Sequence, residues 1–330
     1  MSASIIAEDL VKTYGAHREV RALDGLSLTV HEGTVLSLLG PNGSGKTTTV
    51  RILATLLRPD SGKAHVAGID VVKNPQQVRE IIGLSGQYAA VDETLTGWDN
   101  LIMFGRLYHL SSRGAKARAE ELLEKFSLTD AAKRPIKTYS GGMRRRLDLA
   151  ASLIVKPKVL FLDEPTTGLD PRGRQEMWEV INELVKGGVT LLLTTQYLEE
   201  ADQLADEIVV IDHGHVIAQG TADSLKREVG GERLELSVPF ENLAEARGIV
   251  ERLTNSVATH DPQMHKISVA APGGTSTLVE ALRQFDAVGI QPLDIALKRP
   301  SLDDVFLALT GHVAEEKEEE VSGQSKRGKR

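Results

Sequence analysis

One segment combines glycines, a lysine and a threonine at a spacing suited to phosphate binding. It runs Gly40, Pro41, Asn42, Gly43, Ser44, Gly45, Lys46 and Thr47, with Thr48 beside it. The first eight residues match the phosphate-loop pattern in full. Glycines let backbone N–H groups point inward at an anion, and the start of the following helix adds its dipole. We expect the loop and Thr48 to bind a nucleotide, with Lys46 reaching the β- and γ-phosphates and Thr47 ligating Mg²⁺.

An acidic pair follows the apolar run Val159–Leu162. Asp163 and Glu164 stand where that run ends, and ligands bind at the carboxyl ends of strands in open α/β sheets. An acidic pair after a strand is commonly a solvated turn, but beside a complete phosphate loop it predicts a catalytic site. We expect Asp163 to hold Mg²⁺ and Glu164 to orient or deprotonate the attacking water.

A third group is Ser140, Gly141 and Gly142, which precedes the helical pattern over Leu147–Leu153. A helix N-terminus at this position is a second anion site in the same chain. A serine N-cap explains the residues adequately on its own. Their position ahead of the acidic pair in the same chain favours the anion site over a plain serine N-cap.

Short apolar runs alternating with helical patterns must position these groups. The runs Val35–Leu39, Val159–Leu162 and Val189–Leu193 are almost wholly apolar, which is typical of parallel strands covered on both faces. We therefore predict an α/β domain over residues 1–229. Residues at about 88–151 show helical spacing with no strand-like run between, and we interpret them as a helical insert.

The pattern changes after Gly230 and Gly231. Alternating apolar runs flank two segments of helical spacing, in the β-α-β-β-α-β order of a ferredoxin-like unit. We predict a small α+β domain over residues 231–311, with a last helix capped by Ser301. Residues 312–330 carry glutamates and then basic residues with almost nothing to bury, so we expect a disordered tail.

The composition excludes several classes of function. The 330 residues include no cysteine, so disulfides, cysteine nucleophiles and iron–sulfur clusters are excluded. The net charge of −7 argues against a surface built mainly for nucleic acid. No stretch approaches the roughly 18 apolar residues of a membrane span, and no signal region follows the N-terminus. We expect a cytoplasmic chain that needs a partner chain for any membrane crossing.

In combination these motifs resemble the ATP-binding subunit of an ABC transporter, over about Ile5 to Val229. Ser140–Gly142 is similar to the core of that family's signature motif. Gln87 falls at the Q-loop glutamine, Gly168–Asp170 resembles the D-loop, and Tyr14 is placed like the aromatic residue that stacks on adenine. The resemblance implies the P-loop ABC-type fold and ATP with Mg²⁺ as cofactors. It places Gln87 near the metal and Asp170 near the nucleotide.

Three longer segments, residues 138–148, 193–202 and 301–311, resemble the daunorubicin and doxorubicin resistance subfamily. This implies an exporter motor that works with a separate membrane permease, peripherally at the cytoplasmic face of the cell membrane. Lipid, polysaccharide or peptide cargo is an open alternative. A soluble ABC-type ATPase acting on ribosomes or nucleic acid is a further one, but such proteins usually join two ATPase halves or insert long coiled coils. Neither is seen, and we expect no nucleic-acid partner.

Three positions depart from the family pattern. Tyr139 and Met143 stand where the signature usually has Leu and Gln, and Gln196 stands where the switch histidine should follow the strand. An amide N–H can donate to a γ-phosphate oxygen, but glutamine cannot titrate near neutral pH as histidine can. We expect Gln196 to sense γ-phosphate by hydrogen bonding while Glu164 carries the base role. The alternative is a neutral replacement in a slow site.

The family architecture also implies an ATP-dependent dimer. Each half of the nucleotide site occurs once, so two subunits should pair head-to-tail, each Ser140–Gly142 capping the other's γ-phosphate. Gln87 would report nucleotide state to the permease. The segment Tyr88–Asn100 would contact that permease, unless it is an ordinary connector with Trp98 in the core. We interpret Arg144–Arg146 as part of a partly solvated helix face rather than as a contact with phosphate or RNA. The C-terminal domain would serve either pairing or ligand sensing, because its fold suits both.

Overall fold

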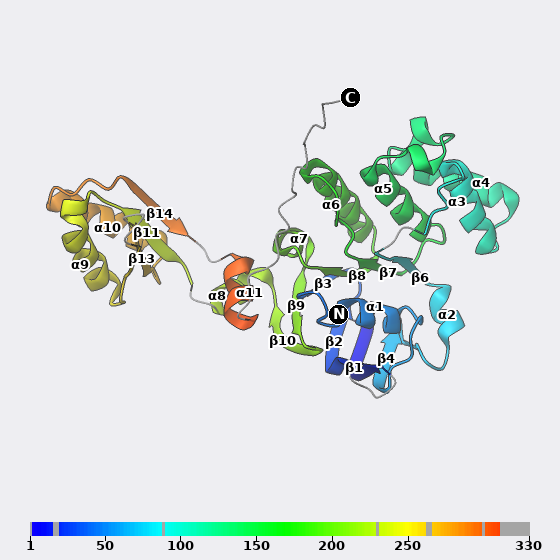
Figure 1. The fold of residues 1–330 in the computed structure, drawn as a ribbon, viewed down its shortest axis with the longest axis horizontal. Coiled ribbons are helices and arrows are strands. Elements are labelled where there is room, and N and C mark those ends of the chain that lie inside the picture. Colours follow the sequence, from blue (N-terminus) through cyan, green and yellow to red (C-terminus); the bar gives the residue numbers. More distant parts are fainter. Residues whose placement is uncertain are drawn as a thin grey trace, which may run out of the picture.

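The computed structural model describes residues 2–15, 20–87, 90–228, 231–261, 266–298 and 301–310 (Figure 1). A six-stranded sheet in the order β10-β9-β3-β8-β7-β6 lies at its centre. Its strands are β3 (Val35–Leu39), β6 (Ile82–Ser85), β7 (Val159–Asp163), β8 (Thr190–Thr195), β9 (Glu207–Asp212) and β10 (His215–Gly220).

The predicted apolar runs form the middle of this sheet. Every residue of β3, β7 and β8 is buried, and these strands pair in parallel, as do β9 with β3 and β6 with β7. Only the pairing of β10 with β9 is antiparallel within this sheet. Because parallel strands end at one edge, the segments after β3, β7 and β8 meet there.

A second, antiparallel sheet was not predicted. It has the order β2-β1-β4-β5 and consists of β1 (Ala3–Tyr14), β2 (Val20–His31), β4 (Ser61–Val66) and β5 (Ile69–Asp70). The register of β1 against β2 shifts at several points, and Asp9 has a positive φ. These irregularities break the strict apolar alternation by which a half-buried strand is recognised.

Helices cover the sheets, and several begin at a side-chain cap. Thr96, Ser111, Ser140 and Asp170 each accept a backbone N–H of the first turn that follows, which satisfies an otherwise unpaired donor. The predicted helical insert is formed by α3 (Gly97–Leu107), α4 (Ser112–Lys125) and α5 (Gly141–Ser152), and the half-buried Trp98 packs against a core that these helices share with the central sheet. The helices are α1 (Lys46–Leu53), α2 (Pro75–Arg79), α3 (Gly97–Leu107), α4 (Ser112–Lys125), α5 (Gly141–Ser152), α6 (Pro171–Lys186), α7 (Leu198–Leu204) and α8 (Ala222–Glu228).

The predicted ferredoxin-like order is confirmed beyond residue 230. The elements are β11 (Arg233–Ser237), α9 (Leu243–Thr254), β12 (Thr259–Asp261), β13 (Lys266–Ala270), α10 (Thr275–Ala287) and β14 (Asp294–Lys298). The strands form an antiparallel sheet in the order β12-β13-β11-β14. The two helices and the sheet enclose a separate apolar core that includes Leu234, Ile249 and Phe285.

The last helix, α11 (Leu302–Thr310), packs elsewhere than its place in the sequence suggests. We expected it within a C-terminal domain of residues 231–311, but it lies beside α8 and α7 (Figure 1). Its buried Leu302, Val305 and Phe306 share one core with Leu198 and Leu225. Ser301 caps it as predicted, accepting the Asp304 N–H at 3.2 Å. The expected tail, residues 312–330, lies outside the described residues.

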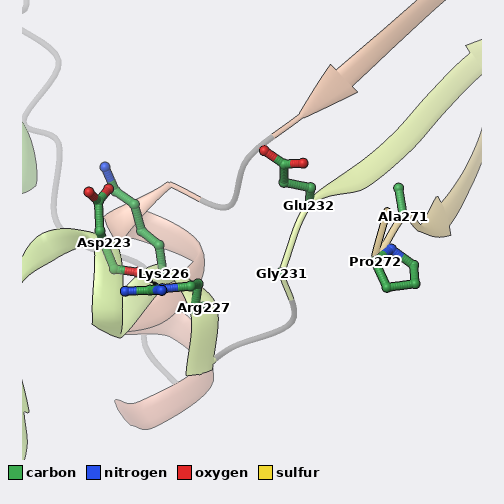
Figure 2. A pocket seen from close by; sticks show the side chains of 7 residues that line it. All are labelled: Asp223, Lys226, Arg227, Gly231, Glu232, Ala271 and Pro272. Carbon is green, nitrogen blue, oxygen red and sulfur yellow. Dashed lines mark hydrogen bonds between the residues drawn. The ribbon is translucent and has the colours of Figure 1, made fainter. Parts of the chain in front are cut away.

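A cavity of about 490 Å³ lies where the chain passes from α8 to β11 (Figure 2). Its lining contains none of the residues expected to bind nucleotide. The residues that line the cavity are Asp223, Lys226, Arg227, Gly231, Glu232, Ala271 and Pro272. In the part of the chain that the structure describes, no helix is both long and apolar enough to span a bilayer.

Candidate ATP-binding site

The phosphate loop joins the buried strand β3 to α1, as predicted. Gly45 stands at the helix start with a φ of 112°, a region that residues with a Cβ rarely adopt. A Cβ at Gly45 would also lie 2.5 Å from the Ala22 carbonyl oxygen. Ser44 Oγ is buried and has no hydrogen-bond partner among the described residues. A buried hydroxyl of this kind suits a loop that receives an anion.

Lys46 is held over the loop by backbone carbonyls. Its Nζ donates to the oxygens of Gly40 at 2.7 Å and Pro41 at 3.1 Å, and it lies 3.7 Å from Glu164 Oε1. Burial lowers the pKa of Lys46, while the charges of Glu164 and Asp163 oppose that shift. The ammonium group therefore lies between the loop and the acidic pair. A phosphate bound there would be strongly attracted by its positive charge.

Asp163 connects the loop to the neighbouring strand. Its Oδ1 accepts from Thr47 Oγ1 at 3.2 Å and from Thr194 Oγ1 at 2.6 Å. Thr47 is the second residue of α1, and Thr194 lies opposite Asp163 in the parallel pairing of β7 and β8. Two of the three residues expected to hold a metal, Thr47 and Asp163, are thus in direct contact, and Thr194 fixes the carboxylate from the other side.

Glu164 adopts a backbone conformation unusual for its residue type. Its φ is 52°, and its N–H lies 3.1 Å from both the carbonyl oxygen and Oγ1 of Thr194. Thr167 Oγ1 donates to Glu164 Oε2 at 3.4 Å. Such a backbone persists only where its surroundings over-determine it, and it is common at functional sites. The contacts aim the carboxylate toward Lys46.

Tyr14 also lies beside the loop. It ends β1 and is 38% exposed, and its hydroxyl is 3.4 Å from Thr48 Oγ1. An exposed ring at this position is available for stacking on a base. The structure thus brings Tyr14, Thr48, Lys46, Asp163 and Glu164 to one edge of the molecule.

Comparisons with known proteins agree with this geometry. Residues 23–167 match the family described as ABC transporter. The chain is 56% identical over 316 residues to a daunorubicin resistance ATP-binding protein of Streptomyces coeruleorubidus, covering 96% of this chain and 97% of that one. It is 50% identical over 328 residues to a doxorubicin resistance ATP-binding protein of Mycobacterium tuberculosis, covering 98% of each. The chain belongs to the ATP-binding subunits of ABC transporters.

Within that family it falls in the daunorubicin and doxorubicin resistance group, and it is an ATPase that binds ATP. A linearmycin resistance ATP-binding protein of Bacillus subtilis is 37% identical, covering 92% of this chain and 97% of that one. A solved ATP-binding subunit of an ABC transporter matches with a TM-score of 0.61 at 28% identity, over 68% of this chain and 92% of that one. The cbiO1 structure from Clostridium perfringens gives 0.62 at 26% identity, over 69% and 95%.

The other family motifs of this ABC ATPase lie at element ends. Ser140 Oγ accepts the Met143 N–H at 3.2 Å at the start of α5, and Asp170 Oδ1 accepts the Gly173 N–H at 2.9 Å at the start of α6. A Cβ on Gly142 would touch Leu169, so the signature and the D-loop are neighbours. The nucleotide-binding roles of these residues remain predictions.

Gln196 follows a strand, as predicted, and Gln87 follows β6, a strand that we did not predict. Gln87 is exposed just after β6, and Gln196 is half-buried just after β8. Tyr88 and Ala89 lie outside the described residues. At the signature, Tyr139 fills a place that the family usually gives to Leu. Its ring is buried and its hydroxyl donates to the Ala131 carbonyl oxygen at 2.7 Å.

The structure adds functional neighbours that sequence reasoning missed. Thr194 holds both acidic residues, and Glu200 on α7 accepts from Thr166 Oγ1 at 2.8 Å, just beyond Glu164. The Arg144–Arg146 run is the partly solvated face we expected, with Arg145 buried at 9% exposure between two half-buried arginines. Arg144 and Arg146 instead form ion pairs with Glu93 and Glu176. Helical spacing places Arg145 on the same face as the apolar Leu149, which could have indicated its burial.

Proposed function

We propose that this chain is the motor of an exporter that expels an anthracycline-like drug or another hydrophobic compound through a separate membrane permease. The observation that carries the proposal is the near full-length likeness to daunorubicin and doxorubicin resistance ATP-binding proteins. The chain would act peripherally at the cytoplasmic face of the cell membrane. The segment from Tyr88 to Asn100 would contact the permease, and Gln87 would report the nucleotide state to it.

Mg²⁺ suits the oxygen donors at the edge of the sheet. Thr47 supplies a hydroxyl and Asp163 a carboxylate, 3.2 Å apart, and Gln87 would add an amide oxygen. Mg²⁺ is usually held by one or two carboxylates together with substrate phosphates and water. When bound, the ion would neutralise charge on the β- and γ-phosphates.

Hydrolysis would then depend on positioning by this chain's residues. Lys46 would bind the phosphates, and Glu164 would orient a water and accept its proton as the water oxygen bonds to the γ-phosphorus. The bond from that phosphorus to the bridging oxygen breaks, leaving ADP and phosphate. Gln196 would donate its amide N–H to a γ-phosphate oxygen.

We further propose that two copies pair head-to-tail around ATP. Ser140 and Gly142 of each copy would cap the nucleotide of the other, using the helix dipole of α5. A Glu164→Gln variant should bind ATP, fail to hydrolyse it and accumulate as a dimer in sedimentation. Monomers alone with ATP bound would count against this arrangement.

Export is tested by co-expressing the chain with its candidate permease in a drug-sensitive host. Survival is scored on anthracyclines, and separately on unrelated toxic compounds, with Lys46→Ala as the matched inactive variant. We expect protection against anthracyclines by the wild type only. Equal protection by Lys46→Ala, or none by the wild type, would contradict the drug-export proposal.

A second candidate is the same motor working on lipid, polysaccharide or peptide cargo. It is supported by likeness to Nod factor export ATP-binding proteins, one of them 39% identical, from Ralstonia nicotianae. Cargo contacts would lie on the permease, so the ATPase residues suit either cargo. Absence of drug protection together with permease-dependent accumulation of such a compound outside the cell would favour this candidate.

A further inference from the structure

Arg145 is a buried cation on α5 whose donors are all directed at backbone carbonyls. Its Nη2 donates to the oxygens of Asp163 at 3.0 Å and Glu164 at 2.9 Å, and its Nε to the Pro165 oxygen at 2.8 Å. Its Nη1 donates to the Gly86 oxygen at 2.8 Å. A guanidinium has five N–H donors in a rigid plane and no acceptor, so one side chain reaches four carbonyls at once.

These carbonyls belong to the two loops that carry the chemistry. Asp163, Glu164 and Pro165 form the turn at the end of β7, and Gly86 directly precedes Gln87. The φ of Glu164 is 52°, a conformation that needs strong support from its surroundings. Three of the four carbonyls lie at or next to that strained residue, so Arg145 supplies support where it is needed.

A second residue of α5 holds the other side of the Gln87 loop. Asp148 is buried, and it accepts from Ser85 Oγ and from the Ala90 N–H, each at 2.6 Å. Residues three apart share a helix face, so Arg145 and Asp148 act from the same side. Together Arg145 and Asp148 form hydrogen bonds to residues before and after Gln87. The helix that carries both of them, α5, begins at the signature residues.

We propose that Arg145 is a positioning residue for ATP hydrolysis, which fixes the backbone carrying Asp163 and Glu164 and ties it to α5. The proposal rests on the proposed role of Glu164 in orienting water. It has a mechanical consequence, because any shift of α5 reaches the acidic pair and the Gln87 loop through one rigid side chain. In the head-to-tail dimer, α5 caps one ATP while its Arg145 positions the residues that act on the other.

The test compares two substitutions with a matched arginine. Arg145→Gln removes the charge, and Arg145→Lys keeps it but offers donors from one nitrogen only, which cannot span four carbonyls. The control is Arg118→Gln on α4. Arg118 also donates to backbone carbonyls, those of Leu153 at 2.7 Å and Ile154 at 3.4 Å, but at the far end of α5. ATP turnover, ATP affinity and thermal midpoint are measured for the purified full chain.

We expect Arg145→Lys and Arg145→Gln to lower kcat by about 10- to 100-fold, the size of effect that a small misplacement of reacting groups produces. ATP affinity should stay near that of the wild type, because Lys46 and the phosphate loop are untouched. Arg118→Gln should lower the thermal midpoint while keeping kcat.

Wild-type kcat in Arg145→Lys would overturn the proposal. So would an equal kcat loss in Arg118→Gln, or loss of folding in both Arg145 variants, because either result assigns Arg145 a purely structural role. These outcomes are read from hydrolysis by the isolated chain, so they are distinct from a failure of drug export by an active wild-type enzyme.

Discussion

Thr194 and Gln196 illustrate how the site depends on side chains at the end of one strand. Thr194 bonds Asp163 and supports the backbone of Glu164, and Gln196 follows two residues later where the family has a histidine. A glutamine there keeps a donor for the γ-phosphate but gives up titration near neutral pH. The base role then falls to Glu164, whose backbone these contacts hold.

The donor role of Gln196 can be measured directly. Gln196→Ala should lower kcat about 10²-fold, because removing one donor to developing charge costs that much in other enzymes. Gln196→His, which keeps an N–H donor, should retain most of the activity. Glu199→Gln at an exposed position nearby is the control. Unchanged turnover in Gln196→Ala would remove Gln196 from the mechanism and leave the neutral-replacement alternative.

The buried carboxyl group of Glu200 should make the stability of the protein depend on pH. Burial raises its pKa, although hydrogen bonds from Thr195, Thr166 and Trp178 and the charge of Arg145 oppose the shift. A carboxyl whose folded-state pKa is raised contributes stability at low pH and loses it as pH rises through that pKa. Glu200→Gln should therefore gain thermal midpoint relative to the wild type as pH rises above the ordinary range of a carboxyl group. A midpoint difference that shrinks with rising pH would contradict this.

At the scale of elements, α11 is the clearest case of packing that sequence order did not predict. It leaves the ferredoxin-like unit and completes an apolar core on α7 and α8. The helix α7 begins just after Gln196 and carries Glu200, so α11 supports an element next to the site. Its apolar face has a partner only because the chain returns to the first domain.

Truncating the buried face of α11 should be costly. Phe306 is 4% exposed, and Phe306→Ala should lower the free energy of unfolding by about 3–5 kcal/mol through lost burial and the cavity left behind. The neighbouring Leu307 is 45% exposed, so Leu307→Ala is the control and should change little. Urea unfolding of both variants measures the difference. Equal destabilisation by the two would show that α11 does not pack as described.

Over the whole molecule, the described residues form an α/β ATPase body, a ferredoxin-like unit and a helix that returns to the body (Figure 1). The two-domain division at residues 1–229 and 231–311 remains a prediction. The return of α11 changes how it should be tested, because removal of everything after residue 230 also uncovers the core of α7 and α8.

Two deletions separate these effects. Removing residues 231–330 should lower the thermal midpoint of the ATPase body, since Leu302, Val305 and Phe306 are lost. Replacing only residues 232–298 by a flexible linker keeps α11 and should preserve that midpoint. ATP turnover and ATP-dependent dimerisation of the second variant then report whether the ferredoxin-like unit serves pairing. Equal midpoints for the two deletions would contradict the stabilising role of α11.

The phosphate loop, the acidic pair, the buried parallel strands and the ferredoxin-like order could all be predicted from the amino-acid sequence. Each of these features can be recognised from residues that are close together in the sequence, such as the glycines before Lys46 or the apolar run before Asp163. The burial of Arg145 against Asp163, Glu164 and Gly86, and the packing of α11 on α7 and α8, became visible only in the folded chain. These contacts join residues far apart in the chain, and burial of a charge or an amphipathic face depends on which distant surface meets it.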